Sequence, residues 1–401
     1  MIFNLAKIDD LNISEKTIFK AIYQYKSISR NDLVKYSNQT PSRVYRLLNS
    51  LVDQDLVIET KEKHNSSGRP FISYTINPDS FYILGAYITW DFFSIGLCTF
   101  DGKILDATEP IRFQQETPQD VVTYFKREIE RFLEVHEIPT EKVLGLGISV
   151  PGPINQDKGI MWNEYHKINE HWNIIPIRDL LEIEIGIPIT IDNLVNAALF
   201  GEVQRGSISL NSNTSAAYIL FDRGVGSAFF TPGLLTKGQE FSGQLGHTIV
   251  KLDGNRCVCG KNGCLETYIS INSLISRMKN RLVNLKGEDK MAVSTQLQQI
   301  EMMVEDNVNS LDFQEIVQSV VIALGNFIHL FQPETVIYGG RIVDFCPSLI
   351  MESIDQIKQK MDISKNIQFR KSSFDNNLLI SGSAITVLEE NFHVSIPFPY
   401  K

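Results

Sequence analysis

Apolar residues recur every three or four positions near the start of the chain, and this spacing predicts three short helices. The first is expected to begin at Ser14 and to run to about Lys26. The second is expected after Ser29, and the third after Thr40, with Pro41 in the first helical position. The apolar stripe of the third helix consists of Val44, Leu47, Leu48 and Leu51.

The opposite side of this third helix is polar and carries side chains of the kinds that contact DNA. Arginine, glutamine and asparagine read base edges in the major groove, and arginine and serine also contact phosphates. A solvated helix face without a ligand has the same composition, and an isolated helix would favour that interpretation. The candidate DNA-contacting residues are Gln39, Ser42, Arg43, Tyr45, Arg46 and Asn49.

The segment after the third helix favours DNA binding. Two β-like runs, residues 56–60 and 71–77, flank a polar, basic tip that contains glycine. Three helices followed by a two-stranded wing is the order of a winged helix-turn-helix domain. We therefore predict a DNA-binding domain over residues 1–78, called the head below. Its wing would place Lys61, Lys63 and Arg69 against backbone phosphate or the minor groove.

From about residue 80 the pattern changes to apolar runs that alternate with helical segments. The runs YILGAYI, VLGLGISV, IPITIDN, AAYILF and ETVIYGG read as strands, and several of them end at glycine turns. Strands that alternate with helices predict an α/β fold with ligands at the carboxyl ends of the strands. The apolar segment from Leu311 to Phe331 reads as a core helix, with a subunit interface as the alternative.

Composition and charge narrow the class of protein. The chain has 401 residues, of which 43% are hydrophobic and 21% are charged, as in ordinary globular proteins. We expect neither a membrane-spanning helix nor a secretory signal, and therefore a cytoplasmic protein. The first 78 residues hold 11 Lys and Arg against 8 Asp and Glu, whereas the remainder holds 27 against 39. A basic head on an acidic body indicates that only the head meets a polyanion.

One short segment, GHTIVKLDGNRCVCGKNGCLE, concentrates metal-binding chemistry. His247, Cys257, Cys259 and Cys264 supply the four nitrogen and sulfur ligands of a tetrahedral zinc site. Three thiolates leave no coordination position for a catalytic water, so the zinc would be structural. A cluster of free cysteines and a disulfide between Cys257 and Cys259 are the alternatives. Gly263 would allow the chain to fold back and present Cys264.

Several motifs together resemble the ROK family, which contains sugar kinases and sugar-responsive repressors. They are GLGISVPGPIN, NEYHKINEHWN, IDNLVNAALFGE, GQLGH, the H…CxCGxxGCxE cluster and ETVIYGG, in that order. The resemblance covers essentially the whole chain and implies a head followed by a two-lobed, actin-like ATPase fold. The implied division is residues 79–195 for the first lobe and 196–401 for the second, with the zinc loop at 247–264.

The phosphate-binding turn of the family's kinases is altered in this chain. Their motif D-x-G-G-T-K falls on residues 87–92, where Tyr87 replaces the acidic residue and Thr89 and Trp90 replace the glycines. An indole at the turn, followed by Asp91, disfavours a phosphate. A second motif of the family's kinases, E-N-D-A-N-A-A, falls on residues 192–198, and its catalytic aspartate position is Leu194. Leucine cannot accept a proton, and a shift of Asp192 into that role is disfavoured. The sequence therefore predicts no kinase activity and no bound ATP.

A sugar site is still implied by the resemblance. It consists of Asn193, Gln244, His247 and Glu266, with Asn169 placed less securely. Gln244 replaces the family's glutamate and keeps a hydrogen-bonding tip without the charge. His247 would bind zinc through one ring nitrogen and offer the other to a sugar hydroxyl. A pentose, an altered hexose or a glycoside would suit this pocket, and loss of sugar binding is the alternative.

These features predict a DNA-binding repressor of carbohydrate-metabolism genes that is gated by a sugar. A sugar that bridges the two lobes would change the orientation of the head through the connection near Asn77–Tyr82. Two-fold operators need two heads, so a homodimer or homotetramer is expected. The competing hypotheses are an active sugar kinase with a DNA-binding head, and a constitutive DNA-binding protein whose body only oligomerises.

Overall fold

The computed structural model describes residues 11–62, 71–114, 116–162, 171–208, 215–231, 234–235, 242–278, 291–307, 310–362 and 366–392. The chain forms two compact units, and each is described by itself. Unit one comprises Met1–Asn163, Lys167–Asn213 and Asn376–Lys401, so it contains the head. Unit two comprises Glu164–His166 and Thr214–Asp375. Lys63, Arg69 and Asn169 lie outside the described residues.

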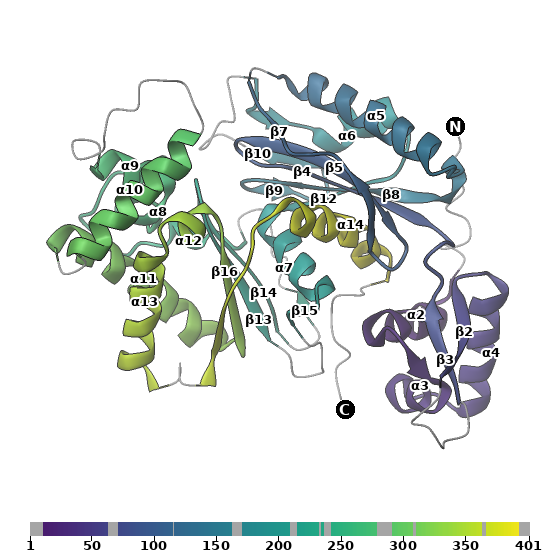
Figure 1. Ribbon diagram of the computed structural model, residues 1–401. Helices are drawn as coiled ribbons and strands as arrows, with labels where there is room; N and C mark the ends of the chain where they lie inside the picture. The colour runs from purple at the N-terminus through teal and green to yellow at the C-terminus, as the bar shows by residue number, and fades with distance from the viewer. Residues whose placement is uncertain are drawn as a thin grey trace. The chain divides into compact units, whose positions relative to one another are not determined.

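The head is a three-helix bundle with a small antiparallel sheet (Figure 1). The strand order is β1-β3-β2, and β2 and β3 form the expected wing. Helix and strand bounds are α2 (Ile13–Tyr25), β1 (Ile28–Ser29), α3 (Arg30–Ser37), α4 (Pro41–Asp53), β2 (Val57–Glu62) and β3 (Phe71–Ile76).

Side-chain caps fix where these helices begin. Ser29 caps α3 and Thr40 caps α4, with Pro41 in the first turn, as the sequence predicts. The expected cap of α2 was wrong by two residues. Asn12, not Ser14, accepts the first backbone amides of α2 and forms a capping box with Glu15.

The sheet of unit one has the order β12-β8-β4-β5-β6, with β7 paired to β5. Strands β4, β8 and β12 are parallel neighbours, whereas β4, β5 and β6 form an antiparallel meander. Strand bounds are β4 (Tyr82–Ile88), β5 (Phe92–Thr99), β6 (Ile104–Ala107), β7 (Ile111–Arg112), β8 (Val143–Val150) and β12 (Ile189–Asn193). A second small sheet has the order β11-β10-β9, from β9 (Ile154–Asn155), β10 (Ile160–Trp162) and β11 (Ile174–Ile175).

Helices cover both faces of the larger sheet (Figure 1). Apolar residues of α5 and α6 pack with alternate residues of β4, β5 and β8 on one face, because successive strand residues point to opposite faces. Helices α14 and α7 cover the other face. The bounds are α5 (Pro118–Val135), η1 (Thr140–Lys142), α6 (Ile177–Ile185), α7 (Leu194–Gln204) and α14 (Asn376–Phe392).

Helix α14 lies so close to the sheet that its backbone contacts the backbone of two strands. A side chain at Gly85 would overlap the carbonyl oxygen of Ile380, and one at Gly147 would overlap that of Ser383. The sheet can therefore accept this helix only because two of its strands carry glycine at the contact. The closing helix of unit one is thus drawn from a segment that follows all of unit two in the chain.

Unit two is built on a five-stranded sheet of order β15-β14-β13-β16-β17. Strands β13, β16 and β17 are parallel, and β14 and β15 continue the sheet in antiparallel register. The bounds are β13 (Ala216–Phe221), β14 (Val225–Thr231), β15 (Leu234–Leu235), η2 (Leu245–His247), α8 (Glu266–Ile269), α9 (Ile271–Met278), α10 (Met291–Asn307), α11 (Leu311–Phe331), β16 (Thr335–Gly339), α12 (Arg341–Phe345), α13 (Pro347–Lys360) and β17 (Gln368–Lys371).

Helix α11 is the core helix of unit two. By length and composition alone it is long and apolar enough to span a membrane, whereas the sequence analysis expects no such helix. Most of its apolar residues are buried among those of the strands and of α13, which accounts for its composition. The core interpretation is therefore confirmed, although Ile322 and Leu330 remain exposed.

The division into lobes differs from the expected one. A boundary at residues 195 and 196 would cut α7, which is a continuous helix from Leu194 to Gln204. The compact units instead separate at residues 213 and 214, and the chain returns to unit one at Asn376. The physical reason is the packing of α14 against α7 and the sheet of unit one.

Candidate functional site

The four predicted metal ligands lie together in unit two. The ligand atoms of His247, Cys257, Cys259 and Cys264 are all within 4.8 Å of one another. His247 Nδ1 lies 3.6 Å from Cys257 Sγ, and the sulfur atoms of Cys259 and Cys264 are 3.6 Å apart. Zinc bound tetrahedrally at about 2.3 Å would separate two sulfurs by roughly 3.8 Å. The residues present therefore fit a tetrahedral zinc ion.

The backbone folds this segment into a chelating knuckle. The amide of Cys257 donates to the carbonyl of Lys261 at 2.8 Å, and that of Gly260 donates to the carbonyl of Cys257 at 3.0 Å. Gly263 has a φ of +72°, and a side chain there would overlap the carbonyl oxygen of Lys251. The expected role of Gly263 in turning the chain toward Cys264 therefore has a geometric reason.

The Cys264 thiol does not ionise readily in the absence of a cation. Burial, together with hydrogen bonds to the neighbouring Cys259 and Cys257 thiols, raises the pKa of Cys264 to about 12. A positive ion is needed to hold such closely spaced sulfurs as thiolates. All five cysteines, the cluster included, are free rather than disulfide-bonded.

The candidate sugar residues are divided between the units. Gln244 and His247 are half-buried and frame η2, and His247 turns Nδ1 toward Cys257, which leaves Nε2 as its other polar atom. Glu266 is not a surface carboxylate, because it is 5% exposed and accepts the amide of Val225 at 3.1 Å. Its carboxylate thus holds the start of β14 against α8.

Asn193 belongs to unit one, where it caps α7. Its Oδ1 accepts the amide of Val195 at 2.8 Å and its Nδ2 donates to the carbonyl of Gly152 at 2.7 Å. Both ends of the amide are therefore engaged in structure. The next residue, Leu194, is 1% exposed and so lies in the interior. Asp192 is fully buried and accepts the amide of Asn193 and Nδ2 of Asn196, each at 2.7 Å.

The turn that would bind phosphate is closed by its own side chain. Thr89 Oγ1 accepts the amides of Asp91 at 3.2 Å and of Phe92 at 2.9 Å. These are backbone donors of the β4–β5 turn, so the hydroxyl occupies the place of an external oxygen. Tyr87 is buried, and its hydroxyl donates to Oδ1 of Asn376 at 2.9 Å.

The polar side of α4 is open to solvent in the head. Ser42, Arg43, Tyr45 and Arg46 are exposed, whereas Gln39 and Asn49 are half-buried. The residues Val44, Leu47, Leu48 and Leu51 are buried as expected. Tyr45 lies beside α3, with the Arg30 guanidinium 5.6 Å from its ring centroid. On the wing, Lys61 is exposed in β2.

A comparison with protein families identifies the family to which the part of the chain after the head belongs. The model of the ROK family matches residues 90–390, about three quarters of the chain. The chain belongs to the ROK family.

Known relatives of this ROK chain include regulators and kinases. The xylose repressor of Caldicellulosiruptor bescii is 24% identical over 390 residues, which cover 94% of this chain and 96% of the relative. A glucokinase of Halalkalibacterium halodurans is 26% identical over 311 residues, covering 73% of this chain and 91% of the relative. The crystal structure of a ROK family transcriptional regulator, a homologue of the Escherichia coli MLC protein, superposes with a TM-score of 0.74 at 21% identity and covers 98% of both chains.

Sequence reasoning missed an aromatic contact between the head and the rest of unit one. Phe19 of α2 stacks on Phe392 of α14 with ring centroids 4.2 Å apart, and lies 5.2 Å from the ring of Phe100. Phe81 packs edge-on against Phe100 at 5.5 Å. These residues are far apart in the sequence of this ROK protein, so the hydrophobic periodicity does not predict that they are in contact.

Polar contacts lie beside these rings. Tyr23 Oη donates to Oε1 of Gln204 at 3.2 Å, and Nε2 of Gln204 donates to the carbonyl of Asp101 at 2.6 Å. Lys26 Nζ also donates to Gln204, at 3.3 Å. Burial raises the pKa of Tyr23 well above its usual value and lowers that of Lys26. We call Phe19, Tyr23, Phe100, Gln204 and Phe392 the head joint.

A buried ion pair at the carboxyl ends of β13 and β16 was also missed. Asp222 is 3% exposed, and its carboxylate accepts both the backbone amide and the guanidinium of Arg341. These two strands are parallel neighbours, so the pair lies where ligands of α/β sheets commonly bind. The available signal was an acidic residue directly after AAYILF and an arginine directly after the glycine pair.

Proposed function

We propose that this protein is a DNA-binding transcriptional repressor of carbohydrate-metabolism genes whose body senses a sugar and does not phosphorylate it. The observation that carries the proposal is the head, in which a capped helix presents a polar, solvent-exposed side beside a two-stranded wing. The xylose repressor relative matches 94% of the chain, whereas the glucokinase relative matches 73%. A duplex selected from a random pool by the full-length protein would provide an operator for measurement.

Asn49 provides a test of base reading by α4. An asparagine amide pairs with adenine in the major groove through two hydrogen bonds, which are worth about 1–3 kcal/mol of discrimination. We expect Asn49→Ala to weaken the selected duplex about tenfold and to leave an unrelated duplex almost unchanged. Fluorescence anisotropy with both duplexes measures this. Lys35→Gln is the control, because Lys35 is exposed and pairs with Asp32 of its own helix. Equal binding by Asn49→Ala and wild type would contradict the proposed base contact.

The absence of kinase activity is proposed from three positions. Thr89 occupies the donors of the phosphate turn, Leu194 stands at the position of the base, and Asp192 is turned into the first turn of α7. Phosphoryl transfer needs a phosphate cradle, a positioned base and carboxylate-held magnesium.

A coupled ATP-hydrolysis assay tests this part of the proposal. We expect no sugar-dependent turnover above the rate without protein, across pentoses, hexoses and glycosides. The Halalkalibacterium halodurans glucokinase, assayed with glucose, shows that the assay detects a ROK kinase. Turnover by this chain with any of these sugars would establish the alternative, a sugar kinase that carries a DNA-binding head.

The remaining assignments follow from the same residues. We propose one structural zinc ion per chain at His247 and the three cysteines, which would hold the imidazole in one orientation. Gln244 and His247 Nε2 are the proposed sugar contacts in unit two. A homodimer or homotetramer would supply two heads to a two-fold operator in the cytoplasm. Thermal shift with a panel of sugars tests for the effector, and no stabilisation by any sugar would favour a constitutive DNA-binding protein.

A further inference from the structure

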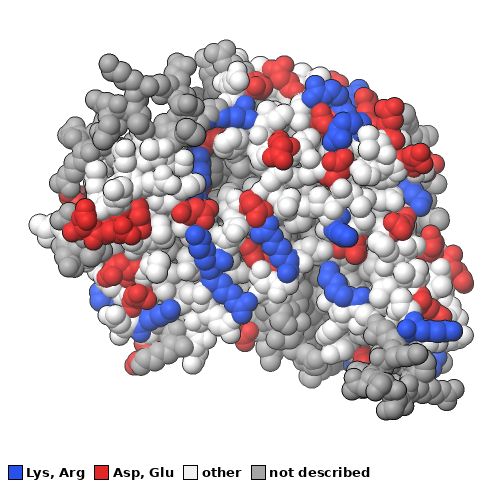
Figure 2. Space-filling model, viewed as in Figure 1, with Lys and Arg blue, Asp and Glu red and all other residues white. Residues whose placement is uncertain are grey.

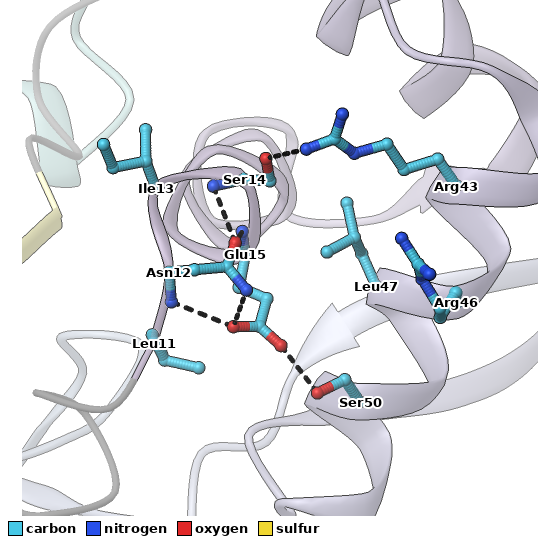
Figure 3. A pocket seen from close by; sticks show the side chains of 9 residues that line it. All are labelled: Leu11, Asn12, Ile13, Ser14, Glu15, Arg43, Arg46, Leu47 and Ser50. Atoms are coloured by element: carbon cyan, nitrogen blue, oxygen red, sulfur yellow. Dashed lines mark hydrogen bonds between the residues drawn. The ribbon is translucent and has the colours of Figure 1, made fainter.

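The head contains a cavity of about 680 Å³ between the start of α2 and one flank of α4 (Figure 3). Two arginines of α4 contribute to its wall, and the opposite side is formed by the first residues of α2. The lining residues are Leu11, Asn12, Ile13, Ser14, Glu15, Arg43, Arg46, Leu47 and Ser50.

The carboxylate in this cavity forms hydrogen bonds to Asn12 and Ser50, and no ion pair joins it to the arginines. Glu15 is 8% exposed and accepts Nδ2 of Asn12 at 2.6 Å and the Ser50 hydroxyl at 2.6 Å. Figure 3 shows these bonds running to Asn12 at the α2 cap and to Ser50 of α4, and none running to a guanidinium group. Among the residues that the structure describes, the side chain of Arg46 forms no hydrogen bond or ion pair with another. The Arg43 guanidinium forms one hydrogen bond, to a neutral hydroxyl.

That hydrogen bond places Arg43 on the flank of α4. Its Nη2 donates to Ser14 Oγ at 2.9 Å, so the guanidinium lies against α2 (Figure 3). Successive residues of a helix are rotated by about 100°, which puts Arg43 about 100° from Ser42 but Arg46 and Asn49 within roughly 40° of it. The side of α4 that would face base edges is therefore centred on Ser42 and Asn49, with Arg43 at its margin and Arg46 between the two.

We infer that this cavity binds one backbone phosphate of DNA between Arg43, Arg46 and the Ser14 hydroxyl. A helix in the major groove is flanked by sugar-phosphate backbone, so a guanidinium at the margin of the helix meets phosphate and not a base. Two arginines without a carboxylate partner match the charge and the acceptor oxygens of that group. The inference rests on the proposed DNA-binding function and adds a role for Arg43 and Ser14.

Salt dependence of DNA binding tests the inference. We expect Arg43→Gln to weaken the selected duplex and an unrelated duplex by the same factor, about tenfold. The slope of log affinity against log salt should fall by about one for both duplexes. Lys35→Gln, with its charge removed elsewhere in the head, should leave the slope within error of wild type. A loss confined to the selected duplex would mean that Arg43 reads a base, and would overturn the inference.

Neutral analogues of single backbone phosphates identify the phosphate that Arg43 contacts. Single methylphosphonates are placed along each half of the selected duplex, and affinity is measured for wild type and for Arg43→Gln. The inference predicts one position per half-site at which the methylphosphonate weakens wild type but has no further effect on the variant. Independent, additive losses at every position would contradict it. If wild-type protein selects and binds no duplex at all, the proposed function itself fails, which is a separate outcome.

Discussion

Cys264→Ser is expected to remove zinc from the cluster and to destabilise unit two by on the order of 3 kcal/mol or more. Cys264 is fully buried, and its sulfur lies 3.6 Å from that of Cys259. Without zinc, the remaining sulfurs repel one another when they are ionised. When they are protonated, no metal ion is bound to hold the knuckle closed. For a unit of this size the loss corresponds to a fall in Tm of roughly 6–12 °C. Metal analysis by mass spectrometry and calorimetry measure the two effects.

Cys346→Ala is the matched control for the zinc prediction. Cys346 is also fully buried in unit two, but it contributes to the apolar core and not to the metal cluster. This variant should be somewhat less stable than wild type and should retain one zinc per chain. Chelator should lower the Tm of wild type and of Cys346→Ala, but not that of Cys264→Ser. Wild-type protein without zinc would show that the cysteines are free thiols, and one zinc per chain in Cys264→Ser would show that Cys264 is not a required ligand.

Phe392→Ala is expected to loosen the head joint and to cost about 3–5 kcal/mol, the usual range for removing a buried phenyl ring. Phe392 is 2% exposed, and its ring covers Phe19 of α2. The polar contacts of Tyr23 with Gln204 and Asp101 are too few to replace this packing. We expect faster amide exchange in α2 and a lower midpoint of denaturant unfolding. Hydrogen-exchange mass spectrometry resolves the change by segment.

Val135→Ala is the control for this second prediction. Val135 is a large apolar residue at the end of α5 that is 61% exposed, so its truncation should change stability by less than about 0.5 kcal/mol. Its exchange pattern in α2 should equal that of wild type. If Phe392→Ala also leaves α2 exchange unchanged, the head is held by the connection near residues 77–82 and not by the head joint.

Local features of this chain were readable from the sequence. The head helices, the caps Ser29 and Thr40, the wing strands and the cluster of His247 with three cysteines each depend on residues close together in the chain. Short-range hydrogen bonds and helical spacing determine such features, so a sequence pattern carries them. The cap of α2 was misplaced because Asn12 and Ser14 both suit that position, and only the capping box with Glu15 separates them.

Contacts between distant segments were not readable. The stacking of Phe19 on Phe392 and the hydrogen bond of Tyr23 to Gln204 join residues that no periodicity relates. The hydrogen bond from Val225 to Glu266 is a further example, since it depends on the approach of α8 to β14. Tertiary packing decides whether a polar residue faces a ligand or its own backbone.

The return of α14 to unit one has a consequence for synthesis of the chain. Strands β4 and β8 are made early, but the helix that covers their glycine face begins at Asn376, after all of Thr214–Asp375. At typical elongation rates this interval takes on the order of 10 to 30 seconds. During that time the nascent sheet has an uncovered apolar face, which is the kind of surface that chaperones bind. Unit two can complete its own core before α14 is synthesised. The sheet of unit one is therefore translated early but is covered only at the end.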